Sequence, residues 1–272
     1  MIDGIVEFFS FAFLVRAFIV GSLVSLCSSL LGVTLVLKRY SMIGDGLAHV
    51  AFGTLSVAVA FNMAPLQVSI PVVMIAAFFL LRISQNSKIQ GDAAIAIIST
   101  SALAIGIIAT SVTSGLNMDV SSFMFGSILA MTIEDVYISV ILSVVVIILY
   151  SFLYHKIFAV TFDENFMKAT GTPVGLYNMV TAFLTAITIV VGMRIMGAML
   201  ISSLIIFPAL TSMRVFKTFR SVVISSAFIS VVCFYIGLAI SFGLSLPTGA
   251  SVVVVNLGMF ILFFLAGVVL KR

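Results

Sequence analysis

Nine long stretches of the chain are almost free of charged residues, and this feature limits most strongly what the chain can fold into. They cover residues 11–37, 42–61, 66–81, 93–113, 136–158, 177–193, 196–213, 221–244 and 250–270. A helix needs about 20 apolar residues to cross a lipid bilayer. Because the apolar residues in these stretches are continuous and do not alternate with polar ones, the pattern favours membrane-spanning helices over a β-barrel.

The composition agrees with a membrane protein and excludes two other classes. Hydrophobic residues make up 62% of the 272 residues and charged residues only 8%, whereas a soluble domain carries roughly 25% charged residues. A water-soluble fold and a disordered chain are therefore both excluded. The connections between stretches are short, so we predict an all-α membrane protein, a polytopic helical bundle formed by residues 1–272 as a single domain.

The number of spans is predicted as eight or nine. Only a short turn around Arg194 separates the sixth stretch from the seventh, and these two could instead be half-helices of one span. A further apolar piece at residues 120–132 is too short to cross comfortably. We expect it to form a re-entrant or interfacial segment.

The basic residues predict the orientation of the chain. If the 82–91 connection lies in the cytoplasm and the spans alternate, eleven of the 13 basic residues are cytoplasmic and only Arg16 and Arg194 lie outside. The cytoplasmic set is Lys38, Arg39, Arg82, Lys88, Lys156, Lys168, Arg214, Lys217, Arg220, Lys271 and Arg272. Such a bias is what orients membrane proteins. The net charge of +4 therefore reflects insertion and not a nucleic-acid partner, and the C-terminus is expected in the cytoplasm.

An acid and an imidazole stand inside the second stretch. Asp45 and His49 are four residues apart, which places them on one face of a helix, one turn apart. Ionisable groups within a span are costly and are usually functional. A carboxylate and an imidazole suit a divalent transition metal such as zinc or manganese. Two structural explanations stay open: a hydrogen bond between the two side chains, or capping of the helix start by Asp45.

One copy of the chain offers too few donors for a complete site. Asp45 and His49 supply two ligands, whereas zinc usually takes four. Two copies related by a two-fold axis would supply two carboxylates and two imidazoles. We therefore expect a homodimer in which the metal passes between the subunits.

A polar connector of residues 162–175 follows the fifth stretch and is the longest one predicted on the cytoplasmic side. Asp163 and Glu164 come early, Lys168 follows, and Gly171 comes shortly before a proline. Acidic residues at the start and a glycine at the end are typical of a short helix. The connector is either a solvated loop or a docking helix for a soluble partner.

Other recognisable chemistry is missing from the sequence. No GxxxxGK[ST] loop is present, so the chain is not expected to bind ATP by that motif. No HExxH or CxxC motif occurs either, and Cys27 and Cys233 both lie within apolar stretches. We expect no bound cofactor and no enzymatic activity.

The second stretch resembles a signature of a known family. Residues 41–49, SMIGDGLAH, preceded by Leu-Lys-Arg, resemble the RRMSLIGDALSHA signature of zinc and manganese permeases, the membrane subunits of ATP-binding-cassette importers. Residues 125–129, 162–171 and 197–209 also agree, in the family's order. Gly46 and Ala48 depart from the usual alanine and serine, both small-for-small changes.

The resemblance implies a homodimeric permease in a prokaryotic cell membrane, joined to a cytoplasmic ATPase dimer and supplied by an extracytoplasmic metal-binding protein. It implies that Asp45 and His49 meet the metal. It also implies that the connector couples the permease to the ATPase. The connector residues assigned to this role are Phe162, Asp163, Glu164, Phe166, Lys168, Ala169 and Gly171.

These observations predict the permease subunit of an ATP-driven zinc importer that works by alternating access, with manganese or iron as the alternative cargo. An ion-coupled secondary transporter would need several carboxylates within its spans, and Asp45 alone qualifies. A channel would carry polar residues periodically along several spans. An intramembrane enzyme would need more than one Asp–His pair. Co-purification with an ATPase would separate the primary transporter from all three.

Overall fold

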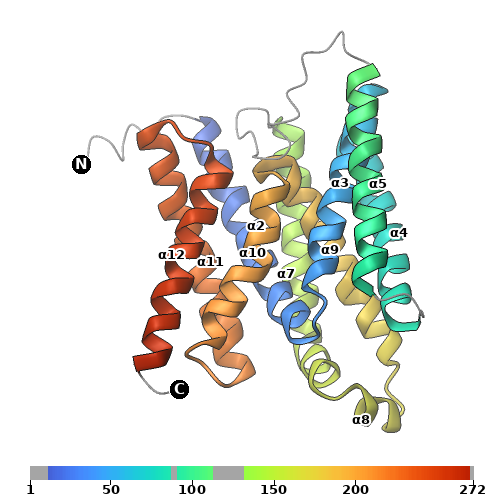
Figure 1. The fold of residues 1–272 in the computed structure, drawn as a ribbon, viewed down its shortest axis with the longest axis vertical. Helices are drawn as coiled ribbons and strands as arrows, with labels where there is room; N and C mark the ends of the chain where they lie inside the picture. Colours follow the sequence, from blue (N-terminus) through green and yellow to red (C-terminus); the bar gives the residue numbers. More distant parts are fainter. Residues whose placement is uncertain (1–11, 87–90, 113–131, 270–272) are drawn as a thin grey trace.

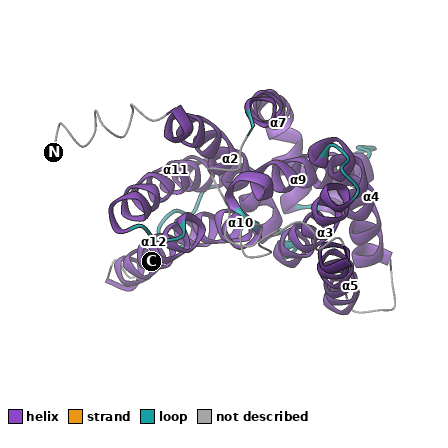
Figure 2. Cartoon of the chain, turned by 90° about the horizontal axis from the view of Figure 1, so that it is seen from above, coloured by secondary structure: helices purple, strands orange, loops and turns teal. Residues whose placement is uncertain are grey.

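The structure is a computed structural model that describes residues 12–86, 91–112 and 132–269, and this part of the chain is helical without strands (Figure 2). Eight helices are long and apolar enough to cross a membrane, which confirms a polytopic helical bundle. In chain order the helices are α2 (Ala12–Leu37), α3 (Ser41–Ala60), α4 (Pro65–Asn86), α5 (Gly91–Val112), α7 (Ile133–Phe162), α8 (Glu164–Ala169), α9 (Val174–Met196), α10 (Ala198–Met213), α11 (Phe219–Leu244) and α12 (Thr248–Val269).

Each of the nine apolar stretches corresponds to one helix. The sixth and seventh stretches form separate helices, α9 and α10, with Gly197 between them at a φ of 83°. α10 has only 16 residues, about 24 Å of helix, so it is shorter than the eight long helices. The interfacial segment expected at residues 120–132 lies outside the described residues except for Thr132, which caps α7.

Figure 1 shows the long helices running up and down the bundle, with α8 at one end and the C-terminus at that same end. This end is called the α8 end below. Seen from above, α5 and α12 lie toward opposite edges of the molecule (Figure 2). Of the long helices, α2, α3 and α9 are the most buried, whereas α5, α7 and α12 are mostly exposed. The exposed apolar side chains of these outer helices are the surface that lipid would cover.

Close backbone contacts at glycines hold the helices together. A Cβ atom added to Gly53 on α3 would collide with the carbonyl oxygen of Ala102 on α5. Likewise, a Cβ at Gly32 on α2 would collide with the carbonyl oxygen of Ile205 on α10. In a membrane, helices associate through such close packing because lipid is as apolar as the side chains are. These glycines therefore fix how near α5 and α2 lie to their neighbours.

We expect that Gly53→Ala lowers the stability of the protein, because the new methyl group meets a backbone oxygen that cannot rotate away. Overpacking of this kind costs about 1–3 kcal/mol. The measurement is the thermal unfolding midpoint of the purified protein in detergent. Gly258→Ala on the exposed face of α12 is the matched control, because a Cβ there has no neighbour within 4 Å. Equal midpoints for both variants would contradict the expectation.

Candidate functional site

Asp45 and His49 lie on α3, well beyond its first residue. α3 begins at Ser41, and its N-cap is Tyr40, without a side-chain capping hydrogen bond. At about 1.5 Å per residue, Asp45 lies about 6 Å and His49 about 12 Å along the helix from its start. Because α3 is 20 residues long, His49 stands near the middle of the span. Asp45 therefore does not cap the helix start.

The two side chains point the same way but do not bind each other closely. His49 Nε2 lies 3.7 Å from Asp45 Oδ2, which is too long for a hydrogen bond. The side chains are 29% and 42% exposed, respectively. Both polar groups therefore remain available to a third atom placed beside α3, and the hydrogen-bond explanation left open by the sequence does not describe this geometry.

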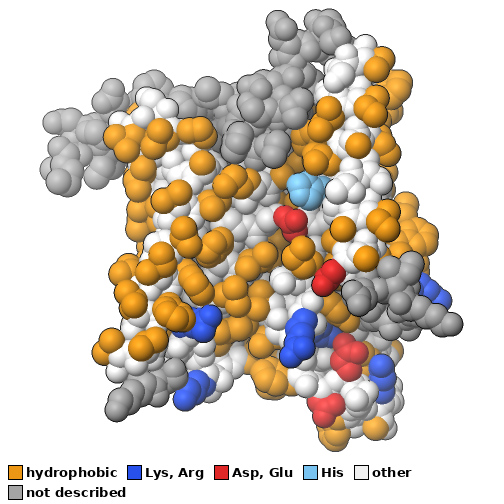
Figure 3. All heavy atoms as spheres, viewed as in Figure 1, with side chains coloured by type: hydrophobic (Ala, Val, Ile, Leu, Met, Phe, Trp, Pro, Cys, Tyr) orange, Lys and Arg blue, Asp and Glu red, His pale blue; other side chains and the backbone are white. Residues whose placement is uncertain are grey.

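The glycines on either side of Asp45 face two different helices. A Cβ at Gly44 would lie 3.5 Å from Ile205 on α10, and a Cβ at Gly46 would lie 2.7 Å from Ile95 on α5. α10 and α5 thus flank α3, and the strip with Asp45 and His49 lies between them. Figure 3 shows a histidine next to an acidic side chain at mid-height, whereas the other acidic and the basic side chains on this face lie lower down.

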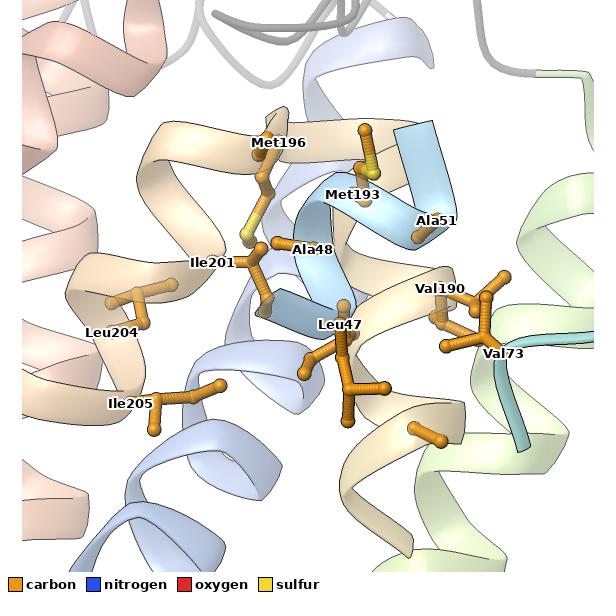
Figure 4. Packing of buried hydrophobic residues seen from close by; sticks show 14 of the residues in the cluster. Leu47, Ala48, Ala51, Val73, Val190, Met193, Met196, Ile201, Leu204 and Ile205 are labelled. Carbon is orange, nitrogen blue, oxygen red and sulfur yellow. The ribbon is translucent and has the colours of Figure 1, made fainter. Parts of the chain in front are cut away.

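The opposite side of α3 is packed against apolar residues. Leu47, Ala48 and Ala51 lie among side chains of α9 and α10, including Met193 and Ile201 (Figure 4). All five of these residues are almost fully buried. This packing fixes the rotation of α3 about its own axis, and it is the reason that the Asp45 side faces outward.

The described part of one chain does not complete a metal site. Within residues 12–86, 91–112 and 132–269, no three side chains of His, Cys, Asp or Glu gather closely enough to hold a metal ion. Asp45 and His49 form a pair with no third ligand of these kinds beside them. A metal site at α3 built from three or more side chains of these four kinds would therefore need donors from outside the described residues of one copy.

The polar connector at the α8 end is shorter than the sequence predicts, because α7 continues to Phe162. Asp163 then caps α8, and its Oδ1 accepts a hydrogen bond from the backbone N–H of Phe166 at 2.8 Å. α8 has six residues and is followed by Gly171 at a φ of 78°. The acidic start and the glycine stop inferred from the sequence are both present.

α8 has a buried side and an exposed side. Met167 packs with Val160 of α7 and Val174 of α9. The side chains of Phe162 and Phe166 are more than half exposed, and so is that of Lys168. Ala169 and Gly171 are exposed as well. The outward surface of the connector therefore combines two large apolar side chains with polar and charged ones, because Asp163 and Asn165 are exposed too. Such a mixed surface is suited to contact with another protein.

Sequence analysis missed two residues that hold α8 in place, Lys38 and Asn178. Lys38 Nζ lies 2.7 Å from Glu164 Oε1, and Asn178 Nδ2 donates a hydrogen bond to the same oxygen at 3.1 Å. Lys38 also donates to the side-chain oxygen of Asn178. The three side chains are called the Lys38 cluster below. Lys38 and Glu164 are 126 residues apart in the sequence, and no local pattern predicts that they meet.

The charges of the Lys38 cluster respond to burial and to each other. Burial lowers the pKa of Lys38, although its bond to Glu164 opposes that shift. Burial alone would raise the pKa of Glu164, but the hydrogen bonds from Lys38 and Asn178 and the nearby lysine charges outweigh it and lower that pKa. Glu164 is therefore a carboxylate at neutral pH, able to pair with the amine of Lys38.

A second buried ion pair lies at the opposite end of the bundle. Arg194 Nη2, at the end of α9, lies 3.4 Å from Asp135 Oδ2, at the start of α7. Asp135 also accepts a hydrogen bond from the backbone N–H of Thr132. The sequence indicated Arg194 only as one of two external basic residues. The pair joins the start of α7 to the end of α9.

Comparisons with known proteins cover nearly the whole chain. The manganese import system permease protein ScaB of Streptococcus gordonii is 26% identical, over 94% of this chain and 92% of its own length. The high-affinity zinc uptake system membrane protein ZnuB of Haemophilus influenzae is 27% identical, over 93% of this chain and 97% of its own.

A solved structure has the same fold. PsaBC from Streptococcus pneumoniae, determined in complex with a Fab, matches 97% of this chain and 95% of its own with a TM-score of 0.87 and 27% identity. The family model of the ABC 3 transport family matches residues 10–267. On this match the chain belongs to the ABC 3 transport family.

Proposed function

We propose that the chain is the permease subunit of an ATP-driven importer of divalent transition metal ions, and that zinc is its cargo. The observation that carries the proposal is the open pair of Asp45 and His49 near the middle of α3, in a chain that belongs to a transport family. A cation that leaves water needs replacement ligands inside the bilayer. The pair offers one carboxylate oxygen and one imidazole nitrogen for that purpose.

The names of relatives support metal as the cargo. ScaB of S. gordonii is named a manganese import permease and ZnuB of H. influenzae a zinc uptake protein. A relative in Thermotoga maritima, 30% identical over 90% of this chain and 86% of its own, is named a probable metal transport system membrane protein. All three names describe transport of metal across a membrane.

The donor chemistry favours zinc over manganese. If two copies meet around a two-fold axis, Asp45 and His49 of each give two oxygen and two nitrogen donors, a four-coordinate set typical of zinc. Manganese prefers a site richer in oxygen donors. The name of ScaB favours manganese instead, so manganese is the second candidate.

The pair is suited to passing an ion onward rather than to storing it. Asp45 and His49 are partly exposed, and 3.7 Å separates their nearest polar atoms, so neither is locked by the other. Two donors per copy give an incomplete shell that an ion can enter and leave. Rocking of the helices about this strip would then expose the ion first to one side of the membrane and then to the other.

Energy for this motion comes from a separate ATPase, as it does for membrane subunits of this transport family. We propose that the α8 end is cytoplasmic, so that the exposed residues of the connector dock on an ATP-binding-cassette dimer. The basic residues of the described chain support this orientation, because Lys38, Lys156, Lys168 and Arg214 all lie at that end. An extracytoplasmic binding protein would deliver the metal to the other end.

We expect that Asp45→Asn and His49→Gln each lower metal uptake at least about tenfold, because each removes one ligand of the passing ion. Combining Asp45→Ala with His49→Ala should abolish uptake. The measurement is accumulation of zinc and manganese, resolved by mass spectrometry, in cells that lack the chain and are complemented with each variant.

The matched control is His155→Gln, which removes the other histidine of the sequence from an exposed position near the α8 end of α7. It should leave uptake unchanged. Each variant is also checked for its amount in the membrane and its co-purification with the ATPase. Normal uptake by the correctly assembled Asp45→Ala/His49→Ala variant would refute the role given to the pair.

The choice between zinc and manganese has its own test. Cells carrying the unchanged chain are given both metals at equal concentration, and we expect zinc to accumulate in preference because the donor set includes imidazole. His49→Asp replaces the nitrogen donor by oxygen and should shift the preference toward manganese. A preference for manganese in the unchanged chain would make manganese the cargo and overturn the choice of zinc.

A further inference from the structure

The Lys38 cluster lies where three segments of the chain meet. Lys38 follows the last residue of α2, Glu164 is the first residue of α8, and Asn178 lies in the second turn of α9. Hydrogen bonds connect all three side chains. The cluster therefore joins the short connector helix to the body of the bundle through polar contacts.

Two lysines approach Glu164, and their surroundings differ. Lys38 Nζ lies 2.7 Å from one carboxylate oxygen and its side chain is 8% exposed. Lys168 Nζ lies 3.9 Å from the other oxygen and its side chain is 61% exposed. An exposed ion pair at that distance contributes little, whereas a short charge-assisted bond shielded from water is among the strong ones. The connection of Glu164 to Lys38 is therefore the one that holds α8.

Lys38 also lies close in the chain to the start of α3. Only Arg39 and Tyr40 separate Lys38 from Ser41, the first residue of α3. This turn is tight: the N–H of Tyr40 bonds the carbonyl of Leu35 at 2.8 Å, and the N–H of Lys38 bonds that of Thr34 at 3.1 Å. A displacement of the Lys38 side chain therefore acts on a short, hydrogen-bonded turn that leads directly into the helix of Asp45 and His49.

The cluster is not closely packed on every side. A cavity adjoins it, lined by Lys38, Ile43 and Leu47 on one side and by Asn178 and Thr181 on the other. Lys38 and Asn178 therefore border a small space between the start of α3 and the start of α9. The apolar contacts of α8, made by Met167, are with α7 and α9 and not with the turn before α3.

We propose that Lys38 is a positioning residue that connects α8 to the helix of Asp45 and His49, so that displacement of α8 shifts α3. This inference rests on the proposed function, in which α8 docks on the ATPase. When the ATPase moves α8, Glu164 moves with it, the amine of Lys38 follows, and the turn before α3 transmits the movement. Lys38 itself does not touch the metal.

The test uses the assembled permease and ATPase in proteoliposomes with zinc as the probe, and measures zinc ions transported per ATP hydrolysed. Lys38→Met keeps an unbranched, flexible side chain that is one atom shorter, and it removes the charge. We expect the ratio to fall at least about tenfold, the size expected when a buried charge-assisted bond is lost, while ATP hydrolysis continues. Lys38→Arg keeps the charge and should retain most of the coupling.

Two further variants separate coupling from folding. Glu164→Gln removes the same ion pair from the α8 side, and it should reproduce the defect without worsening it when combined with Lys38→Met. It also replaces Lys38→Met as the deciding variant if that protein does not assemble. Lys156→Met makes the same substitution at an exposed position of α7 near the α8 end. This control should transport zinc and hydrolyse ATP as the unchanged chain does.

An unchanged ratio of zinc to ATP in assembled Lys38→Met would overturn the inference. So would a parallel loss of transport, hydrolysis and thermal stability, because that pattern marks a residue needed only for folding. Failure of the proposed function looks different: the unchanged chain with its ATPase would then move no zinc or manganese before any substitution is made.

Discussion

The arrangement of this protein depends on how closely its helices approach one another. In lipid, apolar side chains gain nothing by leaving the solvent, so helices must associate through tight packing and polar contacts. Gly53 against the backbone of Ala102 and Gly32 against the backbone of Ile205 provide that packing. They hold α5 against α3 and α10 against α2. Asp45 and His49 occupy a strip of α3 between α5 and α10, which Gly46 and Gly44 face.

Two kinds of ionisable pair stand out in the described part of the bundle. Lys38 with Glu164 at one end, and Arg194 with Asp135 at the other, are paired and largely shielded. Such pairing is what makes a charge tolerable at low dielectric. Asp45 and His49, in contrast, stand within the span of α3, with His49 near its middle, and both are more exposed than either buried cation. The pairs at the two ends connect neighbouring helices of the bundle. The more exposed pair, Asp45 and His49, is the one suited to contact with a transported ion.

Much of the fold could be predicted from the sequence, because each membrane helix is a continuous apolar stretch long enough to be recognised. The predicted ends were less accurate. We placed the end of the fifth span at residue 158, but α7 continues to Phe162. We ended the third span at residue 81, but α4 continues to Asn86. A drop in hydropathy marks the edge of the bilayer, but it does not mark the end of a helix. The helix α7 ends at its C-cap Asp163, beyond the predicted end of the span.

The site was predictable only in part, for a similar physical reason. Asp45 and His49 share one helix, so their spacing alone placed them on one face. Lys38 and Glu164 lie on different segments, as do Arg194 and Asp135, and their pairing depends on tertiary packing that no local pattern encodes. That Asp45 and His49 face outward could not be read from α3 alone either, because it depends on which neighbours pack against Gly44 and Gly46.

The exposure of Asp45 has a consequence for biogenesis. A newly inserted copy that remains alone leaves this carboxylate only partly covered by its own chain, about 6 Å along α3 from its start. An acid within a span costs up to roughly 3 kcal/mol on insertion scales. In the proposed homodimer a second copy would cover the carboxylate and relieve that penalty. Solitary subunits should thus be short-lived targets for membrane quality control, and the cell's supply of finished transporter would be set by how fast newly made copies find each other.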